Sequence, residues 1–154
     1  MPSAYLDGLK MLGRRELSEH QVRQRLARKR YQPDEIEDAV VRLREERAID
    51  DRRVADAIVR TETGIRKRGK VRVRLQLERA GIAKDTARHA LDDGFEAIDG
   101  DALLESSLRK RLRGRDTIAD DREFQRLFRY LVGQGFESDR VMQALREKHK
   151  SRSD

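Results

Sequence analysis

Arginine and lysine are the residues in this chain whose type and spacing most clearly indicate a binding function, because they are concentrated in two short segments. From Arg60 to Arg79 there are eight bases against two acids, and a second basic run lies between Arg109 and Arg115. Guanidinium and ammonium groups at this density bind phosphate or carboxylate oxygens. The candidate binding residues are Arg66, Lys67, Arg68, Lys70, Arg72, Arg74 and Arg79 in the first segment, and Arg109, Lys110, Arg111 and Arg113 in the second.

The overall charge also points to an acidic partner, since the formal net charge is +7 and the pI is near 10.0. A chain with 42% charged residues would also carry many ion pairs on solvated helices, so the total alone decides little. The segregation of charge is more informative, because acids outnumber bases from Asp34 to Asp56. Asn and Trp are absent, which favours phosphate contacts without sequence preference over the reading of base edges.

Residues for catalysis or metal binding are sparse. His20, His89 and His149 are too far apart in sequence to form a ligand motif, and cysteine is absent. The acidic pairs 50–51 and 120–121 would suit a magnesium-dependent nuclease, but each pair opens a predicted helix, where helix capping explains it. The sequence therefore predicts a protein that is not an enzyme, without catalytic residues, cofactor or metal.

These basic segments are set in a pattern that occurs three times, with copies 51 and then 54 residues apart. Each copy places an Asp and an Ala at fixed positions among apolar residues. The sets are Val22, Leu26, Tyr31, Asp34, Ile36, Ala39 and Val40; Val73, Leu77, Ile82, Asp85, Ala87, Ala90 and Leu91; and Leu127, Leu131, Phe136, Asp139, Val141, Ala144 and Leu145. One small helical unit is therefore repeated, and such repeats offer a surface for binding.

The repeat predicts an all-α fold, an elongated array of three tandem three-helix repeats that resemble helix-turn-helix units. The expected boundaries are residues 3–48, 50–95 and 99–149. A unit of about 50 residues is marginally stable alone, so neighbouring repeats should stabilise one another. No apolar run is long enough to cross a membrane, no signal-peptide core is present, and cysteine is absent. We therefore expect a cytoplasmic protein, and a monomer because the apolar residues are assigned to the core.

Local signals place the helix ends. Ser18 and Gln21 form a capping box, and Pro33 suits the first position of a helix. Asp34, Asp85 and Asp139 are expected to cap equivalent helices. The segment from Val71 to Leu77 alternates apolar and polar residues as a strand would, but the repeat register predicts a helix there.

Several motifs resemble the RecX family of bacterial regulatory proteins, and the resemblance covers nearly the whole chain. They are residues 14–18 with Val22 and Leu26, residues 48–55, the basic segment from Gly69 to Ile82, and Gly135-Phe136. The chain departs from the family pattern at Val54, where an aromatic residue is common, and at Arg30, where glycine often precedes the aromatic residue. Both positions are expected to be structural.

The resemblance implies tandem three-helix repeats that bind the RecA recombinase in the groove of its nucleoprotein filament. It implies inhibition of ATP hydrolysis and strand exchange, and a role in DNA recombination, DNA repair and the SOS response. The expected partners are the RecA filament and single-stranded DNA, with double-stranded DNA as a further candidate and no membrane. The alternative is a general, sequence-independent DNA-binding protein without a recombinase partner. A third interpretation is a helical scaffold for another acidic protein.

Overall fold

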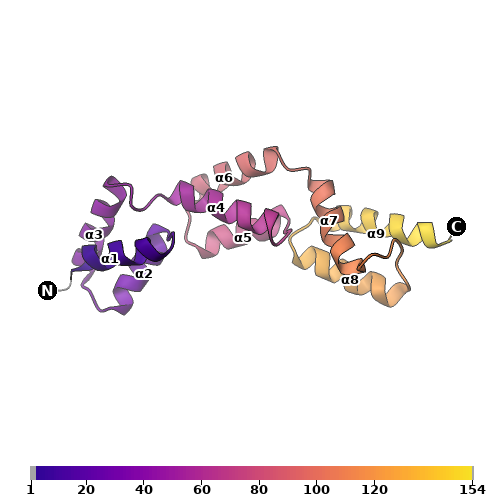
Figure 1. Ribbon diagram of the computed structural model, residues 1–154, viewed down its shortest axis with the longest axis horizontal. Helices are drawn as coiled ribbons and strands as arrows, with labels where there is room; N and C mark the ends of the chain where they lie inside the picture. Colours follow the sequence, from indigo (N-terminus) through magenta and orange to yellow (C-terminus); the bar gives the residue numbers. More distant parts are fainter. Residues whose placement is uncertain (1–2, 154) are drawn as a thin grey trace. The chain divides into compact units, whose positions relative to one another are not determined.

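The computed structural model describes residues 3–153, with side chains described for residues 3–149. Within residues 3–153 it contains nine α-helices and no β-strand (Figure 1), which confirms the all-α prediction. The helices are α1 (Ala4–Arg14), α2 (Glu19–Arg28), α3 (Pro33–Glu45), α4 (Asp51–Gly64), α5 (Lys70–Arg79), α6 (Lys84–Glu96), α7 (Gly100–Leu112), α8 (Asp121–Gly133) and α9 (Ser138–Ser153).

The segment with alternating polarity is helix α5, as the repeat register predicts. Val73 and Leu77 are fully buried and lie four residues apart, so they share one face of the helix. Val71, by contrast, exposes 55% of its surface. The strand-like alternation arises because an exposed valine happens to stand two residues before the buried one.

The chain divides into two compact units. One contains Met1–Ala57 with Leu77–Ala90, and the other contains Ile58–Gln76 with Leu91–Asp154. Each unit therefore includes part of the middle repeat.

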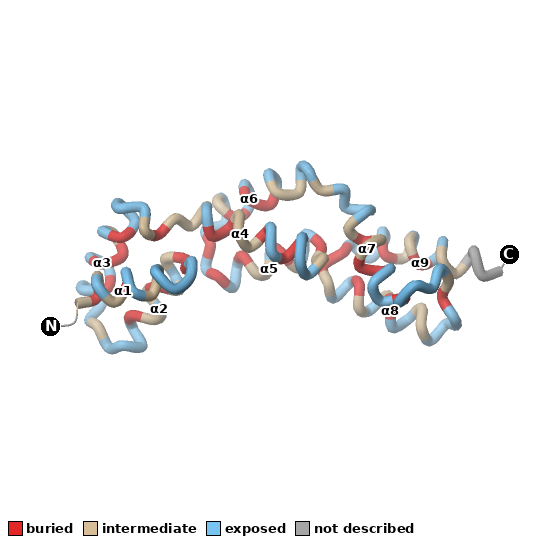
Figure 2. Tube along the Cα trace, viewed as in Figure 1, coloured by how far each residue is buried: buried red, intermediate tan, exposed pale blue. Residues whose placement is uncertain are grey.

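In the first unit, helices α1 to α3 enclose an apolar core, visible as the buried positions in Figure 2. Its fully buried members include Val22, Leu26, Val40 and Leu43, of which the first three belong to the repeat pattern. Gly8 lets α1 approach α3 closely, because a Cβ atom on this residue would lie 2.7 Å from a methyl carbon of Leu43. Close packing of short helices provides most of their stability, since isolated helices of this length are marginal.

In the second unit, helices α7 to α9 enclose an equivalent core (Figures 1 and 2). Leu127, Leu131, Val141 and Leu145, all predicted core residues, are buried in it. Ile118, in the segment between α7 and α8, is also fully buried and packs in this core. The segment therefore has a defined position against the two helices.

The second helix of every repeat ends in the same hydrogen-bonded motif, in which one residue adopts a left-handed conformation. This residue is Arg30 (φ 68°), Gly81 (φ 76°) or Gly135 (φ 98°). Its N–H donates to a carbonyl three residues back, and the next N–H donates to one five residues back, at 2.9 to 3.3 Å. The repeated apolar pairs Leu26–Tyr31, Leu77–Ile82 and Leu131–Phe136 occupy the positions whose hydrophobic contact accompanies this Schellman motif.

Each of the two glycine turns packs against the second helix of the preceding repeat. In the first unit the Ser18 hydroxyl donates to the carbonyl of Ala80, and a Cβ atom on Gly81 would lie 2.3 Å from Cβ of His20. In the second unit the N–H of Gly69 donates to the carbonyl of Gln134 at 2.8 Å. A Cβ atom on Gly135 would lie 2.3 Å from the backbone nitrogen of Arg72. We call these contacts the two turn junctions.

Helix starts follow the predicted capping in part. Ser18 and Gln21 form the capping box of α2, and Pro33 is the first residue of α3. Asp50 accepts a hydrogen bond from the N–H of Arg53 at 3.1 Å, and Asp120 accepts one from the N–H of Glu123 at 2.8 Å. These two residues are therefore helix caps, as predicted.

The prediction that Asp34, Asp85 and Asp139 are caps is wrong. Each is the second residue of its helix, α3, α6 or α9. They lie within the first turn, where a carboxylate interacts favourably with the helix dipole without closing the end of the helix. Residue Gln32 precedes α3, and its N–H donates to Glu35 at 3.2 Å.

Candidate nucleic-acid and filament interface

The first basic segment turns between α4 and α5, and Glu62 orders the turn. A terminal nitrogen of Arg68 lies 2.8 Å from a carboxylate oxygen of Glu62, and the two side chains expose 17% and 8% of their surface. The N–H of Arg68 also donates to the carbonyl of Glu62 at 2.9 Å. Arg66 lies 3.6 Å from the same carboxylate but exposes 54% of its side chain. Arg68 therefore holds the turn in place, while Arg66 remains available to solvent.

Two more of the predicted binding residues are engaged within the protein. The Lys70 ammonium lies 3.5 Å from a carboxylate oxygen of Asp92, with both side chains about half exposed, so this pair contributes little. Arg72 lies at the turn junction with Gly135. Its Nε atom is buried and has no hydrogen-bond partner among the described residues. Arg72 is thus packed at the junction in its present conformation.

The remaining cations of this segment face solvent together with aliphatic side chains. Lys67 is partly exposed and has a left-handed backbone (φ 54°), and Arg74 is exposed on α5. Ile65 and Val71 expose 73% and 55% of their surface. The turn from Ile65 to Gly69 and the start of α5 therefore present positive charge beside apolar groups. Arg79 is also exposed, and it belongs to the first compact unit.

The second basic segment separates into two parts. Arg109 and Lys110 line a surface hollow together with Glu105. A carboxylate oxygen of Glu105 lies 3.8 Å from a terminal nitrogen of Arg109 and 2.8 Å from the ammonium nitrogen of Lys148. Arg111 and Arg113 instead line a different cavity. The four predicted residues of this segment therefore do not form one site.

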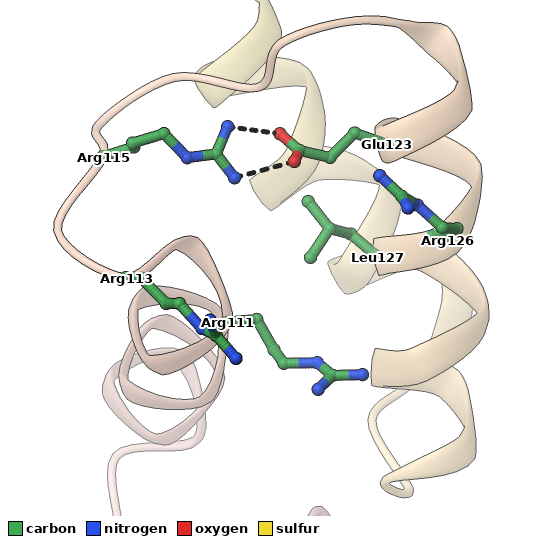
Figure 3. Close-up of a pocket in the computed structure, with 6 residues that line it drawn as sticks. All are labelled: Arg111, Arg113, Arg115, Glu123, Arg126 and Leu127. Atoms are coloured by element: carbon green, nitrogen blue, oxygen red, sulfur yellow. Dashed lines mark hydrogen bonds and ion pairs between the residues drawn. The ribbon is translucent and has the colours of Figure 1, made fainter.

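That second cavity, which we call the arginine pocket, has a volume of about 410 Å³ and lies between the end of α7 and one face of α8. Figure 3 shows Arg115 facing Glu123, while Arg111 and Arg113 extend from the end of α7 and Arg126 from α8. The guanidinium of Arg111 also lies 4.0 Å from the centre of the Tyr130 ring. The lining residues are Arg111, Arg113, Arg115, Glu123, Arg126 and Leu127.

Glu123 and Arg115 form a two-pronged ion pair that fixes one wall of the pocket. The two terminal nitrogens of Arg115 lie 2.8 and 2.7 Å from the two carboxylate oxygens. Nε of Arg115 donates to the carbonyl of Leu112 at 3.3 Å. The hydrogen bond from Arg115, supported by one from the N–H of Ala119, lowers the pKa of Glu123 to about 2. Glu123 is therefore an anion at neutral pH, and its charge is compensated by Arg115.

Two charged residues of the pocket, Glu123 and Arg126, lie outside the predicted basic segments. The helical spacing of Glu123, Arg126, Leu127 and Tyr130 does indicate a shared face of α8. The approach of Arg111 and Arg113 to that face depends on the path of residues 113–120, where Arg113 (φ 51°) and Gly114 (φ 88°) are left-handed. Neither the repeat pattern nor the helix-capping signals specify this path.

The described residues contain no group of three or more His, Asp or Glu side chains that could hold a metal ion. In the same part of the chain, no helix has the length and apolar character needed to cross a membrane. The fold defines an all-helical protein built from three-helix units. Two family models match it, the first three-helix domain of RecX at residues 4–43 and the second three-helix domain of RecX at residues 50–91. The chain belongs to the RecX family of regulatory proteins, which is not a family of enzymes.

Relatives agree with this family assignment, and a solved structure shares the fold. The chain is 32% identical to the regulatory protein RecX of Syntrophotalea carbinolica, over 94% of this chain and 95% of that protein. It is 31% identical to the regulatory protein RecX of Halorhodospira halophila, over 88% and 82% of the two chains. The crystal structure of RecX from Lactobacillus salivarius has the same fold, with a TM-score of 0.69 at 23% identity over 92% of this chain and 94% of that chain.

Proposed function

We propose that this protein binds the RecA recombinase and its DNA filament, and that it inhibits ATP hydrolysis and strand exchange. The observation that carries the proposal is its membership of the RecX regulatory family along nearly the whole chain. The exposed Arg66 and Arg74 and the partly exposed Lys67 support it, because a nucleoprotein filament presents phosphate groups.

The proposed mechanism uses several repeats at once. Three linked repeats, at residues 3–48, 50–95 and 99–149, offer separate surfaces that can contact neighbouring protomers in the filament groove. A ligand shifts a conformational equilibrium by its difference in affinity for the two states. A protein that binds best to one arrangement of neighbouring protomers therefore opposes the rearrangements that strand exchange and ATP turnover require. We further propose that the protein acts as a cytoplasmic monomer in DNA recombination, DNA repair and the SOS response.

The direct test is a titration of RecA ATPase activity on single-stranded DNA with this protein. The unsubstituted protein should inhibit the ATPase. The triple variant Arg66→Gln, Lys67→Gln and Arg74→Gln should inhibit about tenfold less effectively, because phosphate contacts contribute strongly to affinity. Arg68 and Arg72 stay unchanged, since they are packed within the protein. Equal inhibition by the variant would remove this segment from the mechanism.

A matched control removes the same charge elsewhere. Arg28, Arg47 and Arg146 are exposed and lie outside both basic segments, so their joint replacement by Gln should leave inhibition nearly unchanged. Absence of inhibition by the unsubstituted protein would contradict the proposed function itself.

The alternative of a sequence-independent DNA-binding protein draws on the net charge of +7. Capture on bare DNA and on RecA-coated DNA, measured side by side, separates the two functions. The proposed regulator should be retained more strongly by the coated filament. Equal or stronger retention by bare DNA, falling steeply with salt, would favour the alternative.

A further inference from the structure

We propose that the arginine pocket of the third repeat binds the phosphates of a single DNA strand. The inference deepens the proposed function and rests on it, because that function brings the protein into contact with DNA inside a filament. It assigns a ligand to a specific cavity and adds Arg126 to the binding residues.

The position of the pocket in the repeat is the first observation. By the repeat register, Glu123 and Arg126 correspond to Gly69 and Arg72 in the second repeat, where the turn of the following repeat packs at a turn junction. In both turn junctions this place supplies hydrogen-bond donors to carbonyl oxygens, namely those of Ala80 and Gln134. In the third repeat, no turn within residues 3–153 fills the equivalent place, which is the open arginine pocket.

The charge of the pocket is the second observation. Its lining contains four arginines and one glutamate, and the glutamate is already paired with Arg115. Among the described residues, no ion pair engages Arg111, Arg113 or Arg126, and all three are exposed. The place that receives neutral carbonyl oxygens in the other repeats thus offers cationic donors here. Its ligand is therefore expected to be an anion.

The number of available arginines favours a polyanion over a single carboxylate. One carboxylate accepts the two-pronged contact of one guanidinium, as Glu123 does with Arg115, and would leave the other cations uncompensated. A DNA strand instead supplies one negative charge per nucleotide along its length. The guanidinium of Arg111 lies over the ring of Tyr130, and this cation–π contact helps to hold the cation at the wall of the pocket.

The pocket is also ordered in advance of binding. Leu112 and Ile118 are buried on either side of residues 113–117, and Arg115 links the end of α7 to Glu123 on α8. A site whose walls are already fixed loses less conformational entropy when a ligand binds. Asp116 lies in the same connecting segment but does not line the cavity, so it does not occupy the cationic wall.

The test measures the affinity of the full-length protein for a fluorescein-labelled oligothymidylate over a series of salt concentrations. The pocket variant carries Arg111→Gln, Arg113→Gln and Arg126→Gln. The control variant, with the same change in charge, carries Arg28→Gln, Arg47→Gln and Arg146→Gln. We expect the pocket variant to bind about tenfold more weakly, with a salt slope reduced by about 0.7 for each phosphate that the protein no longer binds. The control variant should bind nearly as the parent does, and circular dichroism should show all three proteins to be equally helical.

Two results would overturn the inference. An equal loss of affinity in the pocket and control variants would mean that total charge sets DNA binding. Unchanged oligothymidylate binding would exclude a DNA strand as the ligand of the pocket, and weakened capture of RecA by the same variant would then indicate an acidic protein surface. Inhibition of the RecA ATPase by the unsubstituted protein is measured separately, so failure of the proposed function is distinguished from failure of the pocket.

Discussion

Arg30 is a residue whose backbone conformation suits a different amino acid. It has a φ of 68° after helix α2, where the equivalent residues of the other two repeats are Gly81 and Gly135. Each of those two positions requires glycine for two reasons: the backbone is left-handed, and another helix approaches closely. Arg30 is exposed, so only the first requirement applies to it. Its departure from the family pattern is therefore explained by the lack of a packed neighbour.

The variant Arg30→Gly should be more stable than the parent. A non-glycine residue in this conformation costs about 1 to 2 kcal/mol, part of which is offset by the flexibility of glycine in the unfolded chain. We expect the free energy of unfolding to rise by about 1 kcal/mol, measured by urea denaturation. Arg28→Gly, within helix α2, is the matched comparison and should lower stability. A destabilised Arg30→Gly variant would mean that the arginine side chain makes contacts that outweigh its backbone strain.

Glu123 should make stability depend on acidity. Its pKa is about 2 in the folded protein, below the ordinary value of 4.5, mainly because Arg115 donates to it. A carboxyl group with a lowered folded pKa stabilises fully above its unfolded pKa, and that contribution is lost as the pH falls toward the folded value. The pH range over which this contribution to stability is lost therefore runs from about 4.5 down to about 2.

In thermal unfolding at pH 7, Glu123→Gln should lower Tm by about 3 °C, the shift that a modest loss of stability causes in a chain of this length. The difference from the parent should shrink as the pH falls through this window. Glu96→Gln, at an exposed position on α6, should show little difference at any pH. A Tm difference for Glu123→Gln that stays constant down to pH 2 would show that charge is not its cause.

The turns that end α2, α5 and α8 explain why the repeated pattern has its particular spacing. The leucine of each pattern and the apolar residue five positions later are joined by the backbone hydrogen bond of the turn. Their side chains occupy the positions that pack together in a Schellman motif. The pattern visible in the sequence is therefore the pattern of a helix end, with core residues of the next helix following it.

The two turn junctions make different demands on their partners, and substitutions can show this. Gly135→Ala places a methyl group 2.3 Å from a backbone nitrogen of Arg72, and Gly81→Ala places one 2.3 Å from a side-chain carbon of His20. Both should lower the free energy of unfolding by more than about 2 kcal/mol, through strain in the turn and the steric clash. Urea denaturation measures both effects.

Removal of the neighbouring side chain should restore stability to Gly81→Ala but not to Gly135→Ala. In the background His20→Gly, the cost of Gly81→Ala should fall, because the nearest atoms are those of His20. In the background Arg72→Gly, the cost of Gly135→Ala should persist, because the backbone nitrogen remains. Equal rescue in both double-mutant cycles would contradict this geometry.

For the molecule as a whole, the sequence predicted the helical fold better than the arrangement of the candidate site. The repeat positions of Val22 and Leu26, which Val73 and Leu77 occupy in the second repeat, correctly predicted helix α5. They did so because buried apolar residues recur at helical spacing in each repeat. The roles of single cations were less predictable. Arg68 is paired with Glu62, and Arg126 meets Arg111 and Arg113 across the arginine pocket. Such contacts depend on the paths of connecting segments, and local patterns carry little information about those paths.

The middle repeat takes part in both turn junctions. The turn of the third repeat packs against it at Gly69, and its own turn at Gly81 packs against the first repeat. An in-frame duplication of residues 50–95 would therefore place a donor and a recipient surface on every added copy. Lengthened chains of this kind are accessible both to gene duplication and to protein engineering. Each would keep the arginine pocket of the third repeat, separated from the first repeat by more residues.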